Sequence, residues 1–230
     1  QPDQPVFGAG LAGGEVGLEG VLGGARRVGR LLGGREPGLH ALGEKRRDDA
    51  RKDVAGPRGG ERRQQRRERL LLQVAALLHD VGYHIAHESH HKHSFYLIEN
   101  SELTGFSESE RAVIANVARY HKGSLPKDRH PNFAVLSPAD RLTVARLAGI
   151  LRVADAMDRR HDNRVTDLNC RRTRNVFHIQ ATSTLECENE LTEAGRRLRL
   201  FEKAFQCKLK LSWEPQKGTK QLSAVRGVAG

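Results

Sequence analysis

The pattern of apolar and polar positions changes abruptly near residue 70. Upstream of it, apolar residues occur as short pairs separated by glycine, with no sustained period of 3.6 or 2. From residue 70 to residue 78 almost every position is apolar, which predicts a buried helix that ends at about Asp80, just before Gly82. Further helices are predicted over about 91–100, 107–121 and 138–159, with a proline-containing loop over 125–136.

Two of these helix starts carry specific capping signals. Ser107 and Glu110 have the spacing of a capping box, in which each side chain bonds the main chain of the other residue. Ser137 supplies a hydroxyl cap, Pro138 suits the first turn, and Asp140 follows at the third helical position. Helices are therefore expected to begin next to Ser107 and Ser137.

After residue 164 the pattern changes again. Short strands are predicted over 164–171 and 175–182, around a turn at Thr173 and Arg174. An amphipathic helix over 190–205 and a third strand over 209–213 follow. The chain is therefore expected to be mainly α. Its predicted parts are a helical domain over 70–163, with the bundle over about 70–160, a small β-β-α-β subdomain over about 164–213, and a loose tail over 214–230.

Residues 1–69 have the composition of a low-complexity segment. They hold 16 of the 24 glycines and a single aromatic residue, Phe7. Such a segment cannot bury enough apolar surface to offset the entropy of an ordered chain. It is either a disordered basic arm or an out-of-frame translation of a GC-rich gene that returns to frame around residues 67–70, and we favour the second interpretation.

Composition narrows the class of protein only partly. The formal net charge of +11 suits an anionic partner, but residues 1–69 alone contribute +5, so a solvated basic surface is an equal alternative. The three cysteines form no CxxC pair, which is typical of a reducing compartment. No apolar run could span a bilayer and no signal peptide is visible, so a cytoplasmic protein without a membrane partner is expected.

Four side chains of metal-ligand type fall on predicted inward faces. His79 and Asp80 end the apolar helix, His121 follows the core face of its helix, and Asp155 continues the apolar stripe through Leu151. Buried imidazole and carboxylate groups are usually paired or bound to metal. A site for Mg, Mn, Fe or Zn is therefore one interpretation, and a helix-capping histidine or a helical ion pair of Asp155 with a nearby arginine is the other.

Five histidines lie within ten residues, at positions 84, 87, 90, 91 and 93. They could bind metal, contact phosphate together with Lys92 and Ser94, or simply be solvated. A mixture is favoured, in which His91 turns inward as a ligand while His90 and His93 contact phosphate.

Several separate blocks resemble known families. The block LLHDVG at 77–82 resembles the signature of HD-superfamily phosphohydrolases. Other blocks resemble, more specifically, the C-terminal region of the exopolyphosphatase / guanosine pentaphosphate phosphohydrolase (Ppx/GppA) family. These blocks are HHKHSFYLI at 90–98, NSEL at 100–103, GF at 105–106, RYH at 119–121 and LRVADAMDR at 151–159. The resemblance covers about 70–213 and implies an HD-like helical domain followed by a small α/β subdomain.

The resemblance also implies candidate site residues. His79 and Asp80 match the HD pair, Asp155 matches the closing aspartate, and His91 and His121 match the intervening histidines. The candidate contacts to phosphate or polyphosphate are His90, Lys92, His93, Ser94, Arg119 and Lys122. Two departures stand out: the superfamily's first histidine has no helical counterpart upstream of His79, and the family's N-terminal catalytic domains are not recognisable in 1–69.

Three functions are weighed on this basis. The first is an accessory domain of an exopolyphosphatase-like protein, without its catalytic domains, which binds polyphosphate and supports a homodimer. The second is a metal-dependent HD phosphohydrolase that acts on nucleotide or (p)ppGpp-like phosphoesters. The third, a nucleic-acid-binding protein led by the basic arm at 26–69, ranks last because that arm has no aromatic residue for base stacking.

Overall fold

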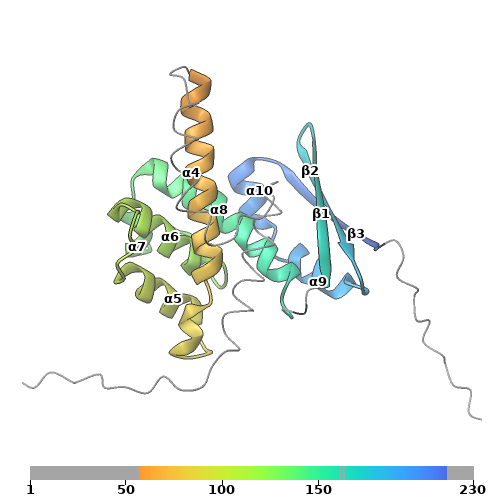
Figure 1. The fold of residues 1–230 in the computed structure, drawn as a ribbon, viewed down its shortest axis with the longest axis horizontal. Helices are drawn as coiled ribbons and strands as arrows, with labels where there is room; N and C mark the ends of the chain where they lie inside the picture. The colour runs from red at the N-terminus through yellow and green to blue at the C-terminus, as the bar shows by residue number, and fades with distance from the viewer. Residues whose placement is uncertain (1–56, 161, 163, 217–230) are drawn as a thin grey trace, which may run out of the picture.

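The computed structural model describes residues 57–160, 162 and 164–216, which form a helical bundle and a small sheet side by side (Figure 1). Most of the predicted low-complexity segment, and most of the predicted tail, lies outside these residues. Within them, no helix combines the length and apolarity that crossing a membrane requires.

The helical bundle surrounds one apolar core. Its elements are α4 (Pro57–Leu78), the 3-10 helix η1 (Val81–His84), α5 (His90–Glu99), α6 (Glu108–Tyr120), α7 (Pro131–Ala134) and α8 (Pro138–Met157). Leu72 of α4, Ile114 of α6 and Leu151 of α8 are buried in this core. Since burial of each such side chain contributes about 2 kcal/mol, the core holds these three helices together.

Both predicted caps are confirmed. The hydroxyl of Ser107 accepts a hydrogen bond from the amide of Glu110, and the Glu110 carboxylate accepts one from the amide of Ser107 at 2.9 Å. At the start of α8, the hydroxyl of Ser137 accepts from the amide of Asp140 at 3.1 Å, and Pro138 is the first helical residue. Caps of this kind stabilise a helix start by about 1 kcal/mol.

The second part is a three-stranded sheet covered by two helices. β1 (Val165–Thr173) pairs antiparallel with β2 (Val176–Ser183), and β3 (Lys208–Pro215) runs parallel to β2 on its other side. A parallel pair needs a long connection, which α9 (Glu188–Gly195) and α10 (Arg199–Phe205) supply. Ile179 of β2 is buried with Phe201 of α10 in a second core. The predicted fold class, mainly α with a small sheet, is confirmed.

α8 joins the two parts because both cores bury it. Val144 lies in the first core, whereas Val153 and Met157 lie in the second. α10 approaches α8 closely at Gly149, where an added Cβ would lie 3.0 Å from the Cα of Phe201. The C-terminal half of α8 is therefore fixed between the bundle and the sheet.

Three elements differ from the sequence prediction. α4 begins at Pro57 instead of at about residue 70, the helix predicted over 190–205 is divided by a turn at 196–198, and the loop over 125–136 contains the short helix α7. Apolar periodicity marks where side chains are buried, not where a helix ends. Residues 61–66 of α4 are exposed and polar, so the pattern gave no sign of that part of the helix.

Arg67 attaches the polar half of α4 to the bundle. Its guanidinium makes a two-pronged ion pair with Glu110, donates to the carbonyl of Gly105 at 3.1 Å, and lies 4.8 Å from the ring centroid of Phe106. The hydrogen bond from Arg67 lowers the pKa of Glu110 to about 2. The anchor for this part of α4 is thus polar.

Substitution of Arg67 by alanine should lower the free energy of unfolding by about 1 kcal/mol at pH 7, since a half-exposed ion pair and a cation–ring contact are lost. The pKa of Glu110 lies below its usual value of 4.5, so the pair stabilises the fold above that pH and the contribution disappears as the pH falls towards about 2. Urea unfolding at several pH values measures this. Arg63→Ala, at an exposed position of the same helix, should stay within about 0.5 kcal/mol of the parent chain. An Arg67→Ala penalty that is the same at pH 7 and pH 3 would contradict the ion pair.

Candidate metal centre

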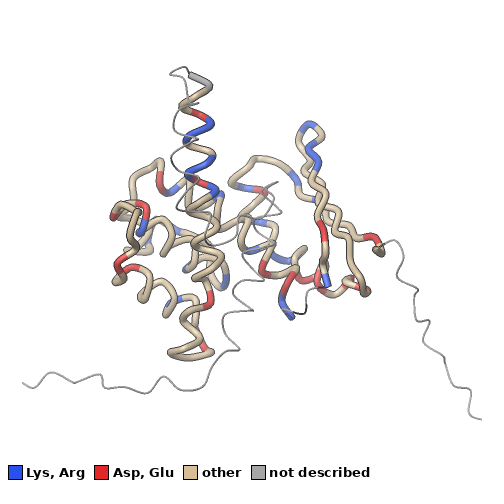
Figure 2. The backbone as a smooth tube through the Cα atoms, in the orientation of Figure 1, with Lys and Arg blue, Asp and Glu red and all other residues tan. Residues whose placement is uncertain are grey.

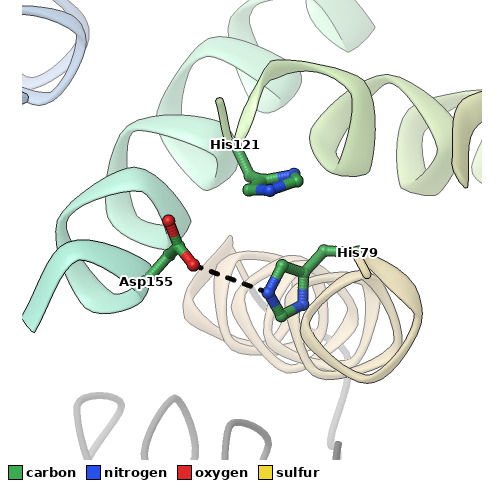
Figure 3. A group of neighbouring side chains, drawn as sticks. All are labelled: His79, His121 and Asp155. Carbon is green, nitrogen blue, oxygen red and sulfur yellow. Dashed lines mark ion pairs between the residues drawn. The ribbon is translucent and has the colours of Figure 1, made fainter. Parts of the chain in front are cut away.

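Five side chains of ligand type meet where α4, α5, α6 and α8 converge. His79 and Asp80 follow α4, His90 begins α5, His121 follows α6, and Asp155 lies in the last turns of α8. The ligand atoms of His79, His121 and Asp155 all lie within 4.8 Å of one another, and the same holds for Asp80, His90 and His121. Figure 3 shows the side chains of His79, His121 and Asp155 directed towards one another from three separate parts of the bundle. We call these five residues the His/Asp cluster.

The three histidines of the cluster are oriented in the same way. The Nδ1 atom of each ring lies within hydrogen-bond distance of a carbonyl oxygen three residues earlier: His79 to Ala76 at 2.9 Å, His90 to His87 at 3.0 Å and His121 to Ala118 at 2.6 Å. A carbonyl can only accept, so each Nδ1 must donate, and Nε2 of a neutral ring is left with its lone pair. Metal-ligating histidines are commonly oriented by such a bond.

The Asp80 carboxylate lies among the three Nε2 atoms. Its Oδ1 is 3.4 Å from Nε2 of His90 and 3.6 Å from Nε2 of His121, and its Oδ2 is 3.2 Å from Nε2 of His79. Nε2 of His79 also lies 3.8 Å from Oδ1 of Asp155, the pair joined in Figure 3. Three imidazole and two carboxylate groups of metal-ligand type thus lie close together, in two overlapping groups of three.

Charge in the cluster is concentrated on His79 and the two aspartates. Burial alone would lower the pKa of His79, but the carboxylates of Asp155 and Asp80 raise it to about 10. Burial alone would raise the pKa of each aspartate, but His79 and the positive charge that it carries lower both. At neutral pH and without a bound cation, a charged His79 therefore faces two ionised carboxylates.

The other two histidines are neutral at pH 7. Burial, followed by the charge of His79, lowers the pKa of His121 to about 3. Burial also lowers the pKa of His90. Both rings are therefore in the form that can donate a lone pair to a metal.

Several polar atoms of the cluster are poorly satisfied by the protein itself. Nε2 of His79 and Oδ1 of Asp80 are buried without a hydrogen-bond partner among the described residues. Nε2 of His90 faces Nε2 of His121 at 3.3 Å, although both carry lone pairs when Nδ1 donates. An unsatisfied buried polar group costs about 1–3 kcal/mol. A cation among these atoms would satisfy all of them, so the residues fit a divalent metal ion.

Two arginines form hydrogen bonds at the edge of the cluster. Arg197, in the turn between α9 and α10, donates to Oδ2 of Asp155 at 2.6 Å. Arg152 of α8 donates to the carbonyls of Tyr120 at 2.8 Å and of Gly123 at 3.0 Å, next to His121. The partner of Asp155 is therefore Arg197, which belongs to the other part of the fold. Arg152 bonds main-chain carbonyls instead of forming the helical ion pair with Asp155 that was considered from the sequence.

A close backbone contact brings His90 to the cluster. The hydroxyl of Ser94 donates to the carbonyl of His79 at 2.6 Å and accepts from the amide of Gly82 at 2.9 Å. A Cβ on Gly82 would lie 2.1 Å from the carbonyl oxygen of His90. Ser94 was predicted to contact phosphate. It is fully buried, and its hydroxyl is used in hydrogen bonds to main-chain atoms of the chain itself.

The other predicted residues lie beside the cluster. His91 belongs to neither group of ligand atoms, and its ring centroid is 6.4 Å from that of His121. Burial and Arg119 lower the pKa of His91 to about 4, with smaller effects from Lys92 and Lys122. Among the neighbouring histidines, His90 therefore occupies the inward position that the sequence predicted for His91. The remaining predicted phosphate contact, His93, is half-buried on α5.

The fold and the cluster together define a helical domain with a buried His/Asp site, which is consistent with the HD-like resemblance. Residues 56–197, more than half of the chain, match the family model for the Ppx/GppA phosphatase, domain III. The chain therefore belongs to the Ppx/GppA phosphatase family, and the predicted family is confirmed.

Two curated relatives carry the same printed name, guanosine-5'-triphosphate,3'-diphosphate pyrophosphatase. The protein from Pseudoalteromonas translucida (strain TAC 125) is 46% identical over 57 residues, which are 25% of this chain and 12% of the relative. The protein from Pseudoalteromonas atlantica (strain T6c / ATCC BAA-1087) is 33% identical over 52 residues, 23% of this chain and 10% of the relative. The matched segment thus spans about a tenth of each relative's length.

Gly82→Ala should destabilise the protein by about 3 kcal/mol or more, because the new methyl group meets backbone atoms of α5 that cannot move independently. Thermal and urea unfolding measure the loss. Gly195→Ala is a matched control, since an added Cβ there meets nothing within 4 Å, and it should change stability by less than about 0.5 kcal/mol. Equal stability of the two variants would show that α5 does not depend on this contact.

Proposed function

We propose that this chain is a phosphate-binding domain of a Ppx/GppA-type phosphohydrolase, and that it binds phosphate through a divalent cation held by the His/Asp cluster. The observation that carries the proposal is the shared orientation of three histidines. Their Nδ1 atoms are used by main-chain carbonyls, and their Nε2 atoms converge on Asp80, whose Oδ1 has no hydrogen-bond partner in the described part of the chain. A hydrogen-bonded core would instead use those atoms within the protein.

Each residue of the cluster has a defined role in this proposal. His79, His90 and His121 would offer nitrogen ligands, and Asp80 and Asp155 would offer oxygen ligands. This mixed set suits Mn, Fe, Zn or Mg better than a metal that prefers thiolate. When bound, such an ion polarises a phosphoryl oxygen and lowers the pKa of bound water. Arg197 would keep Asp155 in its ligating orientation.

Cations near the cluster support an anionic ligand. Lys92, Arg119 and Lys122 all act electrostatically on His91, so their charges gather around the start of α5 and the end of α6. We assign them to a polyphosphate chain or a phosphorylated nucleotide, and such contacts should weaken as salt is added. The homodimer expected from the sequence remains a prediction. Most of the basic arm that favoured nucleic acid lies outside the described residues.

A second candidate function is hydrolysis at the cluster itself. The mixed donor set favours it, because an ion held by histidine and carboxylate ligands can activate water as well as bind phosphate. Both hydrolysis and accessory binding would depend on the same ion. They differ in whether phosphate is released, so one series of measurements can separate them.

Metal analysis and calorimetry of the purified chain should find one divalent ion bound by the cluster. Asp80→Asn should weaken binding at least about tenfold, since even loss of an outer partner has an effect of that size. His84→Ala is the matched control: it removes an exposed histidine close to the cluster and should leave affinity unchanged. Identical metal content in all three proteins would refute the cluster as the site.

The two functions are then separated with inorganic tripolyphosphate. Tripolyphosphate should bind the metal-loaded chain more tightly than the chain in chelator, and Asp80→Asn should lose that difference. Release of orthophosphate that depends on both the metal and Asp80 would establish hydrolysis. Metal-dependent binding without any release would establish the accessory role.

A further inference from the structure

His90 is held differently from the other two histidines of the His/Asp cluster. Nδ1 of His79 and Nδ1 of His121 each donate to a carbonyl of the helix that the residue follows. Nδ1 of His90 donates instead to the carbonyl of His87, which lies in the irregular segment between η1 and α5. Loops are more mobile than helices, so this hydrogen bond alone orients the ring of His90 less firmly.

The ring of Tyr83 supplies a second contact to His90. The two rings are stacked, with 4.0 Å between their centroids and 15° between their planes. The ring of His87 packs against the same tyrosine, with 5.1 Å between the centroids. His90 is buried whereas Tyr83 is 39% exposed, so the tyrosine covers the face of the imidazole on which it stacks.

The main chain connects Tyr83 to another member of the cluster. The amide of Tyr83 donates to the carbonyl of Asp80 at 3.0 Å, so this one residue contacts His90 through its ring and Asp80 through its main chain. Residues 81–90 contain no Lys or Arg, and the loop that they form at the end of α4 carries no blue in Figure 2. The loop therefore holds His90 by ring contacts and a main-chain hydrogen bond.

Stacking of this kind also favours the metal-bound form of His90. An imidazole that donates its lone pair to a cation takes on part of the positive charge, and the face of a phenol ring attracts that charge. We propose that Tyr83 is a positioning residue of the metal centre, which fixes the ring of His90 for ligation and so raises the affinity of the cluster for a divalent ion. This role rests on the metal centre proposed above.

Calorimetry of the full chain with Co²⁺ tests the role of Tyr83. Tyr83→Leu removes the stacked ring and should weaken Co²⁺ binding about tenfold, the lower end of the usual effect of losing an outer partner of a metal ligand. Tyr83→Phe keeps the ring and should stay within about twofold of the parent chain. Tyr96→Leu is the matched control and should also stay within about twofold, because Tyr96 is 63% exposed on the helix that His90 begins.

A double-mutant cycle shows whether Tyr83 acts through His90. His90→Ala should weaken Co²⁺ binding, and addition of Tyr83→Leu to that variant should weaken it no further. A general structural role would instead lower the affinity by the same factor whether or not His90 is present. That result, or an affinity of Tyr83→Leu equal to that of the parent chain, would overturn the proposal.

A measurement without metal separates the positioning of His90 from the metal centre itself. In ¹H–¹⁵N NMR spectra of the chain in chelator, His90 should carry its proton on Nδ1. Tyr83→Leu should shift or broaden the signals of that imidazole and leave those of His121 unchanged. Absence of Co²⁺ binding by the parent chain, together with these spectral changes, would refute the metal centre and still support Tyr83 as the residue that orients His90. Identical His90 signals in the two proteins would overturn the positioning role.

Discussion

The packing of α8 on both of its sides is the constraint on which the rest of the structure depends. Its first turns are buried by the helical bundle and its last turns by the sheet, so the helix has little freedom to rotate. Asp155 lies on the part that is held from both directions. A carboxylate fixed in such a position must find partners, and it finds Arg197 from the sheet side and His79 from the bundle side. The cluster is thus built at the joint between the two parts.

The helix ends supply the second requirement, which is the orientation of the histidines. The last carbonyls of a helix have no intrahelical partner. His79 and His121 follow the last residues of α4 and α6, and each ring donates to a carbonyl of its own helix end. One hydrogen bond therefore satisfies the helix end and also fixes which ring nitrogen carries the proton. The cluster needs no separate set of residues to orient these two rings.

The sequence predicted the parts of this arrangement that follow from periodicity. The inward directions of His121 and Asp155 came from the apolar stripes of their helices, and each long stripe has a well-defined face. His90 could not be distinguished from His91 in this way, because it is the first residue of α5 and its direction depends on the chain before it. Ser89 there has a φ of 58°, which no apolar pattern records.

Hydrogen bonds and ion pairs between residues far apart in the sequence could not be predicted for a related reason. Arg197 reaches Asp155 from a turn that replaces the middle of a predicted helix, and the pair is 42 residues apart. Arg67 and Glu110 are 43 residues apart, and nothing in the local pattern of α4 indicates that contact. Pairing of this kind is set by how elements pack, which single-sequence patterns do not contain.

The charges of the cluster connect the proposed cation to the proposed anion. With His79 protonated, the positive charges of His79 and Arg197 balance the carboxylates of Asp80 and Asp155, and the pocket has no excess charge to offer. Metal ligation requires a neutral His79. Binding of a divalent ion therefore adds two positive charges, while loss of the proton from His79 removes one. The occupied pocket then carries a net positive charge beside Lys122 and Arg119. A phosphate oxygen is attracted to that state and not to the balanced one, so cation and phosphate should each raise the affinity for the other.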